Sequence, residues 1–355
     1  MRTELTEYAD DLCRVSEEGL DWGAFEGKTV AVTGATGMIG AFLVDVLMRT
    51  NADGLQCKVV AMGRNEGKAR KRLPYFGSPL FSFVKWDALE EVELERADYL
   101  LHLASSTHPA AYVADPVGTI RANVNGLDRL LAFSSGCGAR LLFASSVEIY
   151  GENRGDVERF GEGYCGYIDC NTLRACYNES KRLGESLCQA HKKQGGADVV
   201  IARIARSYGP TLLKDDTRAL SQFMRNALEG RNIVLHSDGA QRFSYLYVAD
   251  VVSGLLRVLL EGECGEAYNL ADEASDIRLR DLAKMVADAA GLAVEFRLPD
   301  EGESSGYSKA TVAMMDGSKV RALGWRARDD IEGGVAKTLR LLAALSWADD
   351  GRRQL

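Results

Sequence analysis

Tyr177 and Lys181 stand four residues apart in a stretch that reads Tyr-Asn-Glu-Ser-Lys. Two residues at this spacing on a helix share one face, so the phenol and the ammonium would lie close together. A nearby ammonium favours the phenolate form of a tyrosine, which can then act as a base near neutral pH. Such a pair taken alone is more often a surface contact, so its meaning depends on the motifs around it.

A second group of reactive side chains lies in the segment Ser145–Gly151, which reads Ser-Ser-Val-Glu-Ile-Tyr-Gly. The segment follows the apolar run 141–144, which is typical of a buried strand. Open α/β sheets bind their ligands beyond the carboxyl ends of their strands. Ser146 could therefore hydrogen-bond a reacting hydroxyl group, although a serine in this place could equally cap a turn.

A glycine-rich turn extends from Thr33 to Gly40 and reads Thr-Gly-Ala-Thr-Gly-Met-Ile-Gly. It follows the apolar residues 29–32 and precedes a stretch with apolar residues at helical spacing. Glycines in this position let the backbone turn tightly and approach a pyrophosphate at the N-terminus of a helix. The placement between a strand and a helix favours dinucleotide binding over a plain tight turn.

Further apolar runs indicate the strands that must position these motifs. The runs lie at 29–32, 58–62, 81–84, 99–103, 141–144 and 199–202, with helical patterns between them, notably at 116–135 and 175–193. Apolar runs without alternation suit strands that are buried on both faces, as in a parallel sheet. The rhythm of strand and helix therefore predicts an α/β fold with a doubly wound parallel sheet of the Rossmann type.

The rest of the chain predicts a smaller lobe. Helical patterns near 216–229, 248–261, 278–290 and 332–346 follow Pro210, with a short strand at 233–235. We expect residues 211–355 to be mainly a substrate-binding lobe, which crosses back to the sheet through a return segment near 243–262. The NAD(P)-binding Rossmann domain would then span 28–210, and residues 1–27 would form an N-terminal helical arm.

The composition excludes several classes of function. The formal net charge is −8 and no basic stripe is present, which argues against nucleic acid as a partner. No run of about 18 apolar residues suggests a membrane span, and the acidic N-terminus lacks the apolar core of a signal peptide. Eight cysteines without a paired framework suit the reduced thiols of a cytoplasmic protein. Cys165, Cys170 and Cys176 lack a zinc-type spacing, so we expect no metal site.

Together, the motifs resemble the extended short-chain dehydrogenase/reductase superfamily, in its nucleotide-sugar epimerase, dehydratase and decarboxylase branch. The resemblance covers roughly residues 28–326 and rests on the order of the motifs along the chain. Besides the three motifs above, the matching segments are Asp87, His102-Leu103-Ala104, Asn123-Val124-Asn125-Gly126, Ser207-Tyr208-Gly209-Pro210, Tyr247-Val248-Ala249-Asp250 and Tyr268-Asn269-Leu270. Within the branch, the motifs are most similar to those of UDP-glucuronate decarboxylases.

The resemblance implies a role for each motif residue. Tyr177 would be the catalytic base with Lys181 as its partner. Ser146 would orient the sugar of a nucleotide-sugar substrate, and Glu148 would lie near its C5 atom. The cofactor would contact Gly34, Thr36, Gly37, Met38, Ile39, Arg64, Asp87, Ala88, Leu103, Ala104, Ser105, Asn123 and Lys181. The substrate would contact Ser106, Ser146, Arg174, Arg206, Arg242 and Asn269.

The resemblance also implies a homodimer and leaves two cofactors open. Apolar residues on the helices near 120–135 and 175–193 match the usual pairing surface of the superfamily. NAD enzymes often bind the ribose 2′-hydroxyl with an acid about 20 residues past the glycines. Here the second strand ends with Arg64, which could face a 2′-phosphate or stack on adenine. Members of the branch that reduce their own intermediate usually retain NAD, so we expect NAD and leave NADP open.

Three reactions could follow the oxidation at sugar C4 that the branch shares. A 4-epimerase returns the hydride to the other face of the ketone, a 4,6-dehydratase eliminates water, and a decarboxylase releases CO₂ from a β-keto acid. Plain epimerases usually have a small residue at the Glu148 position, whereas dehydratases and decarboxylases have a glutamate close to C5. The alternative is a surface glutamate on a turn. Dehydratases place an acid where this chain has Val147, which cannot donate a proton.

Decarboxylation of the UDP-glucuronate type is therefore the expected reaction. The alternatives are 4-epimerisation or 4,6-dehydration, and, in another class, a non-catalytic NAD(P) sensor or scaffold. Val147 also replaces the serine usual in decarboxylases, Arg206 replaces an asparagine, and the Arg-x-Phe pattern is changed so that Arg242 is displaced by one place. Arg174 and Arg206 could bind a carboxylate or a diphosphate, or could form structural ion pairs.

Overall fold

Seven parallel strands form the central sheet of the computed structural model, which describes residues 1–105, 107, 109–297 and 311–345. The strand order is β10-β6-β5-β4-β1-β2-β3. The bounds are β1 Thr29–Thr33, β2 Lys58–Gly63, β3 Phe81–Lys85, β4 Tyr99–His102, β5 Arg140–Ser146, β6 Val199–Ile204 and β10 Ala267–Leu270. The first six lie where the apolar runs predict them, with ends that differ by at most two residues. The predicted α/β fold with a doubly wound parallel sheet is confirmed.

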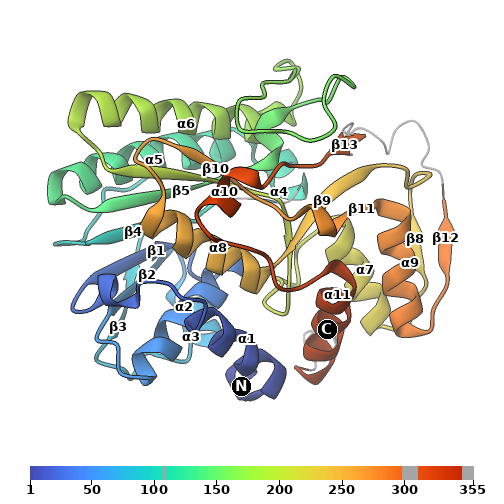
Figure 1. The fold of residues 1–355 in the computed structure, drawn as a ribbon, viewed down its shortest axis with the longest axis horizontal. Helices are drawn as coiled ribbons and strands as arrows, with labels where there is room; N and C mark the ends of the chain where they lie inside the picture. Colours follow the sequence, from blue (N-terminus) through green and yellow to red (C-terminus); the bar gives the residue numbers. More distant parts are fainter. Residues whose placement is uncertain (106, 108, 298–310, 346–355) are drawn as a thin grey trace.

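Helices cover both faces of the sheet (Figure 1). On one face α5 and α6 pack against each other, with the short α4 beside α5. On the other face α2 packs against α8. The bounds are α2 Met38–Ala52, α3 Glu66–Arg72, α4 Pro109–Ala114, α5 Pro116–Cys137, α6 Ala175–Gly195, α8 Val248–Glu261 and, for the 3-10 helix after β5, η3 Val147–Tyr150. The adjacent strands β1, β4 and β5 all point their carboxyl ends toward the smaller lobe (Figure 1).

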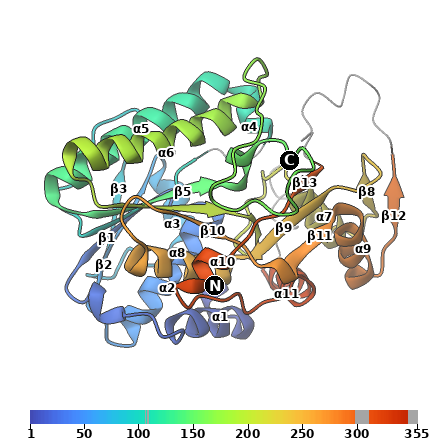
Figure 2. The same cartoon turned by 45° about the horizontal axis from the view of Figure 1, so that its top comes forward.

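The smaller lobe contains two short sheets and the helices that pack on them (Figure 2). In one sheet β9 pairs with β7, β11 and β13, and in the other β8 pairs with β12. The bounds are β7 Arg206–Tyr208, β8 Ile233–Leu235, β9 Arg242–Tyr247, β11 Asp276–Arg278, β12 Val294–Phe296, β13 Val312–Ala313, α7 Ala219–Leu228, η4 Glu273–Ser275, α9 Leu279–Ala290, α10 Ser318–Ala322 and α11 Ile331–Ala344.

The chain returns from this lobe to the central sheet through α8, which lies within the expected return segment 243–262, and through β10, which follows it. Within that segment, β9 belongs to the small lobe sheet and α8 packs against β5 and β6. The strand that enters the central sheet is β10, which pairs with β6 immediately after α8. Helix α8 and strand β10 thus connect the lobe to the cofactor half.

The N-terminal arm comprises η1 Arg2–Glu4, α1 Thr6–Ser16 and η2 Trp22–Phe25. Helix α1 packs against α2, α8 and α11, so it contacts both the cofactor half and the end of the described chain. Arg14 forms ion pairs with Asp250, at 2.8 Å, and with Asp329, at 2.6 Å. Lys337 reaches Asp11 at 2.7 Å. These contacts thus join the N-terminal arm to α11, the last helix of the described chain.

Three general features of the described residues bear on function. None of their helices is long and apolar enough to cross a membrane. None of their His, Cys, Asp and Glu side chains gather in groups of three or more that could hold a metal ion. All eight cysteines are free thiols, and Cys165 and Cys170 are exposed.

Candidate active site

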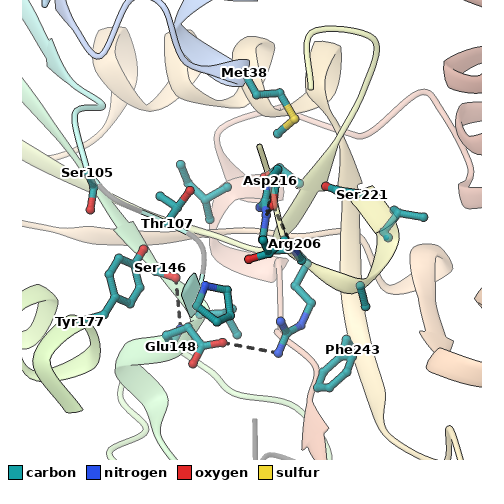
Figure 3. A pocket seen from close by; sticks show the side chains of 18 of the residues that line it. Met38, Ser105, Thr107, Ser146, Glu148, Tyr177, Arg206, Asp216, Ser221 and Phe243 are labelled. Carbon is teal, nitrogen blue, oxygen red and sulfur yellow. Dashed lines mark hydrogen bonds and ion pairs between the residues drawn. The ribbon is translucent and has the colours of Figure 1, made fainter. Parts of the chain in front are cut away.

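A cavity of about 820 Å³ opens beyond the carboxyl ends of β1, β4 and β5 and continues into the smaller lobe. The glycine turn lines one end, and residues of β8 and β9 line the other. Side chains of Tyr177, Ser146, Glu148 and Arg206 lie around the space between these ends (Figure 3). The cavity therefore lies where a doubly wound sheet binds its ligands, and it joins the predicted motifs in one place.

The glycine turn offers a cradle that fits the pyrophosphate of a dinucleotide. Gly34 has a φ of +67°, and a Cβ atom there would lie 2.8 Å from the backbone nitrogen of Ala104. Helix α2 begins after Gly37, which gives it no side-chain cap. The backbone N–H groups of residues 38–40 have no acceptor within the helix, as in the first turn of any helix. These donors line the cavity together with the positive end of the helix dipole, which suits an anionic diphosphate.

We expect the substitution Gly34→Val to abolish NAD(H) binding. The valine would be strained at a positive φ, and its Cβ would collide with the Leu103–Ala104 backbone beside the pyrophosphate cradle. Fluorescence titration of the purified variant with NADH measures the effect. Gly19→Val is the matched control, because Gly19 has the same φ of +67° but no atom within 4 Å of the added Cβ. NADH binding by a folded Gly34→Val variant at the affinity of the original chain would contradict this assignment.

The other predicted cofactor residues lie at different depths around the cavity. Those that line it are Gly34, Gly37, Met38, Ile39, Leu103, Ser105 and Lys181, whereas Thr36, Arg64, Asp87, Ala88, Ala104 and Asn123 do not. Asn123 lies behind the lining, because its Oδ1 accepts a hydrogen bond of 2.7 Å from Ser105 Oγ. Arg64 is exposed at the end of β2. Ser106, a predicted substrate contact, lies outside the described residues.

Helix α6 places Tyr177 and Lys181 in this cavity, and β5 ends there with Ser146. Burial raises the pKa of the Tyr177 phenol to about 12, against the opposing effect of its hydrogen bond with Ser146. Burial also lowers the pKa of the Lys181 ammonium to about 7. Lys181 Nζ donates to the Ala144 carbonyl at 2.8 Å and lies 5.9 Å from the centre of the Tyr177 ring. The predicted proximity of the two side chains is present, and burial opposes the charged form of each.

Glu148 lies on η3, where the Ser146 hydroxyl accepts a 3.3 Å hydrogen bond from the Glu148 backbone N–H. Its carboxylate forms an ion pair with Arg174, at 3.0 Å. A second ion pair, at 3.4 Å, joins it to Arg206 (Figure 3). Burial by itself would raise the pKa of the Glu148 carboxyl, but the two arginines outweigh burial and hold this pKa below its ordinary value. Glu148 is therefore an ionised group inside the cavity and not a surface glutamate on a turn.

Strand β9 presents alternate side chains to the cavity, as the two-residue period of a strand requires. Phe243 and Tyr245 line the cavity, whereas Arg242 and Ser244, which alternate with them along the strand, do not. The guanidinium of Arg206, from the neighbouring strand β7, lies 3.8 Å from the centre of the Phe243 ring. The predicted substrate contacts Arg174 and Arg206 thus reach the cavity, and Arg242 does not.

Asn269 also lies away from the cavity. Its side chain is fully buried, and its Oδ1 accepts a 2.5 Å hydrogen bond from the Tyr150 hydroxyl. Its Nδ2 donates to the carbonyl oxygens of Phe160, at 2.8 Å, and Asp316, at 3.0 Å. Because these bonds satisfy both ends of the carboxamide, we assign Asn269 the structural role of holding β10 to the loops beside it.

Two charged residues of the cavity are absent from the sequence-based prediction. Asp216 and Arg218 precede α7 and line the cavity, and they form a paired contact with Nη2–Oδ2 of 2.6 Å and Nε–Oδ2 of 2.9 Å. In the sequence they stand only two residues apart, before an amphipathic helix, and this spacing carries no signature of its own. Only the folding of the lobe over the sheet brings them close to Tyr177.

Comparison with known proteins identifies the family of this chain. The family model described as the NAD dependent epimerase/dehydratase family matches residues 30–271, which is more than half of the chain. The chain belongs to this family of enzymes. The family and its solved members bind NAD, which agrees with the fit of the glycine turn.

Relatives of this chain include UDP-glucuronic acid decarboxylases. UDP-glucuronic acid decarboxylase 1 of Xenopus tropicalis is 31% identical over 315 residues, covering 88% of this chain and 71% of that protein. UDP-glucuronic acid decarboxylase 6 of Arabidopsis thaliana is 32% identical over 307 residues, or 86% of each chain.

Two solved structures share the fold of this family member. The dTDP-glucose 4,6-dehydratase DesIV of Streptomyces venezuelae, with NAD and TYD bound, has a TM-score of 0.77 and 24% identity, covering 91% of this chain and 99% of that one. The UDP-glucuronic acid 4-epimerase of Bacillus cereus, in complex with UDP-glucuronic acid and NAD, has a TM-score of 0.76 and 21% identity, covering 89% and 99%. One fold thus serves decarboxylases, dehydratases and epimerases.

Proposed function

We propose that this enzyme decarboxylates a nucleotide-linked uronic acid of the UDP-glucuronate type, using NAD to oxidise sugar C4 transiently. The observation that carries the proposal is the ionised Glu148 in one cavity with Ser146 and Tyr177. A glutamate near the reacting sugar suits a reaction that moves a proton at C5, which a plain 4-epimerase does not need. The neighbouring Val147 offers no acid for a leaving hydroxyl, which disfavours 4,6-dehydration. The decarboxylase relatives agree with this choice.

The residues of the cavity then have distinct tasks. Ser146 holds the C4 hydroxyl, and Tyr177 takes its proton as C4 becomes a ketone. Bound NAD would supply the hydride acceptor for this oxidation, and its positive ring would favour the phenolate form of Tyr177. A ketone at C4 stands β to the C6 carboxylate, so the C5–C6 bond can break to CO₂ while its electron pair forms an enolate. Glu148, after taking up a proton from solvent, would deliver the proton that C5 must then receive, and the hydride would return to C4 to close the cycle.

A panel of candidate substrates tests the proposal directly. The enzyme and NAD are incubated with UDP-, dTDP-, CDP- and GDP-sugars, including the uronic acids. Mass spectrometry then measures the masses of the products. We expect loss of CO₂ from a uronic acid. Loss of water would establish 4,6-dehydration instead, and an unchanged mass with altered stereochemistry would establish 4-epimerisation. A chain that leaves the whole panel unchanged would fit a non-catalytic sensor.

We further propose NAD rather than NADP as the working cofactor. Arg64 stands exposed at the end of β2, where it could attract a 2′-phosphate, so the sequence leaves NADP open. The reaction returns its hydride within one cycle, and the enzyme therefore gains nothing from the reduced cytoplasmic NADP pool. We expect tighter binding of NAD than of NADP in paired titrations. Preference for NADP, lost selectively in Arg64→Ala, would reverse this choice.

We also propose a homodimer that pairs through the helices on one face of the sheet. Large apolar side chains are exposed there, namely Val113, Val117, Ile120, Leu173 and Leu183. Leu183→Glu would place a charge on this surface, so we expect it to convert dimers to monomers. Light scattering after gel filtration measures the mass. Phe296→Glu is the control, because Phe296 is as exposed but lies on β12 of the lobe. A concentration-independent monomer in the unmodified protein would refute the dimer.

A further inference from the structure

Arg206 lines the cavity but uses little of its hydrogen-bonding capacity. The central carbon of its guanidinium lies over the Phe243 ring, 3.8 Å from the ring centre, which is close enough for a cation–π contact. One nitrogen, Nη2, makes the 3.4 Å contact with Glu148, which is the longer of the two ion pairs of that carboxylate. Its Nε is buried and has no hydrogen-bond partner among the described residues. A buried donor without an acceptor is costly unless a ligand supplies one.

The position of Arg206 indicates which ligand group would supply that acceptor. Figure 3 shows Tyr177 and Ser146 on one side of Glu148 and Arg206 on the other, against Phe243. Beyond Phe243 the cavity continues along β8 into the lobe. A nucleotide-sugar whose sugar reacts at Tyr177 has only that part of the cavity for its nucleoside. The diphosphate that links the two halves would then lie beside Arg206.

We propose that Arg206 anchors the diphosphate of the substrate, and that this contact releases Glu148 from the second of its two arginines. The inference rests on the proposed function, since it assumes a nucleotide-sugar substrate. A planar guanidinium matches two phosphate oxygens with paired hydrogen bonds, and a diphosphate carries more charge than one carboxylate. The diphosphate would therefore win the competition for Arg206, and the unpartnered Nε would gain an acceptor.

The exchange has a consequence for Glu148. With both arginines in place, the carboxylate is stabilised as an anion, and its pKa is low. When Arg206 turns to the diphosphate, only Arg174 remains, and the proton affinity of Glu148 rises. Binding of the nucleotide half would thus prepare Glu148 for proton transfer at the sugar. The enzyme would be fully competent only with a complete nucleotide-sugar in place.

A binding measurement tests the anchor without any turnover. UDP, dTDP, CDP and GDP are titrated calorimetrically into the NAD-loaded enzyme, and the tightest binder is used for the variants. We expect Arg206→Met, which keeps the length and the aromatic contact but removes the charge, to weaken binding at least tenfold. The affinity for the corresponding nucleoside monophosphate should fall much less in this variant. Arg278→Met, an exposed arginine on β11, removes the same charge outside the cavity and should bind as the original chain does.

A double-mutant cycle tests the competition with Glu148. Glu148→Gln removes the anion that competes for Arg206, so we expect it to tighten diphosphate binding several-fold. In the Arg206→Met background the same change should alter affinity less than twofold, because the competition no longer exists. A merely structural role for Arg206 predicts no such dependence. Equal tightening in both backgrounds would overturn the exchange.

The remaining outcomes separate this inference from the proposed function. Melting curves and retained NADH binding show that each variant is folded. Unchanged UDP affinity in folded Arg206→Met overturns the anchor but leaves decarboxylation standing. A loss seen with UDP-glucuronate but not with UDP also overturns it, because the anion at Arg206 would then be the sugar carboxylate. An original chain that binds none of the four diphosphates overturns both this inference and the substrate class.

Discussion

Replacing Tyr177 by phenylalanine is expected to slow reduction of the cofactor by about 10²–10⁴-fold, the usual contribution of a general base. The hydroxyl lost is the group that takes the C4 proton, and Ser146 beside it is too weak an acid–base group to replace it. Stopped-flow absorbance of the reduced nicotinamide, in a single turnover with excess enzyme, measures the step.

A neighbouring tyrosine provides the control. The Tyr112 ring stacks on Tyr177 with centroids 5.1 Å apart, and its hydroxyl donates to the Thr107 carbonyl. Tyr112→Phe therefore removes a hydroxyl from the same aromatic pair without removing the base, and reduction should stay within a few-fold of the original rate. Reduction at the original rate in Tyr177→Phe would mean that the base lies elsewhere.

Glu148→Gln should separate the two halves of the reaction. Oxidation at C4 needs Tyr177 and not Glu148, so reduced nicotinamide should still form on the enzyme. The later proton transfer at C5 should then fall by about 10²–10⁴-fold, and the absorbance should persist instead of decaying. The same stopped-flow record, with CO₂ and sugar products quenched at intervals, shows where the cycle stops.

Glu152→Gln is the matched control for this experiment, because Glu152 is an exposed glutamate four residues further along the chain. Its substitution should leave both phases unchanged. Normal turnover by Glu148→Gln would instead make Glu148 a residue that only shapes η3 and balances its two arginines. Simple 4-epimerisation would then become the better proposal.

The parts of the site that lie within one strand or helix could be predicted from the sequence. The apolar runs located the first six strands of the central sheet, because strands buried on both faces have a strong local pattern. The four-residue spacing of Tyr177 and Lys181 put both on one face of α6. The glycine turn was equally local, since it needs only a strand before it and a helix after it.

What the sequence could not supply depends on contacts between distant segments. Glu148 meets Arg174 and Arg206 only because η3, the start of α6 and β7 converge, so its ionised state could not be foreseen. The pKa of Tyr177 depends on burial, which no spacing reveals. Motif matching also suggested Asn269 as a substrate contact, although its hydrogen bonds hold loops together.

The displaced arginine of β9 shows the same limit at the scale of one residue. A shift by one position along a strand moves a side chain to the opposite face. Arg242 therefore leaves the cavity and Phe243 enters it. Arg206, which the sequence presented as a separate departure from the family pattern, supplies a cation over that phenylalanine. The two departures belong together only in three dimensions.

The bonds between the arm and the far end of the chain constrain how the protein is made. Arg14 is synthesised more than 300 residues before its partner Asp329, and the same holds for Asp11 and its partner Lys337. Loop closure over such a separation is slow, and translation at about 5–20 residues per second adds a further delay. The apolar face of α1 can pack on α2 early, but the ion pairs of α1 with the far end must wait until nearly the whole chain is available. Removing the arm should harm yield during synthesis more than it harms the catalytic groups themselves.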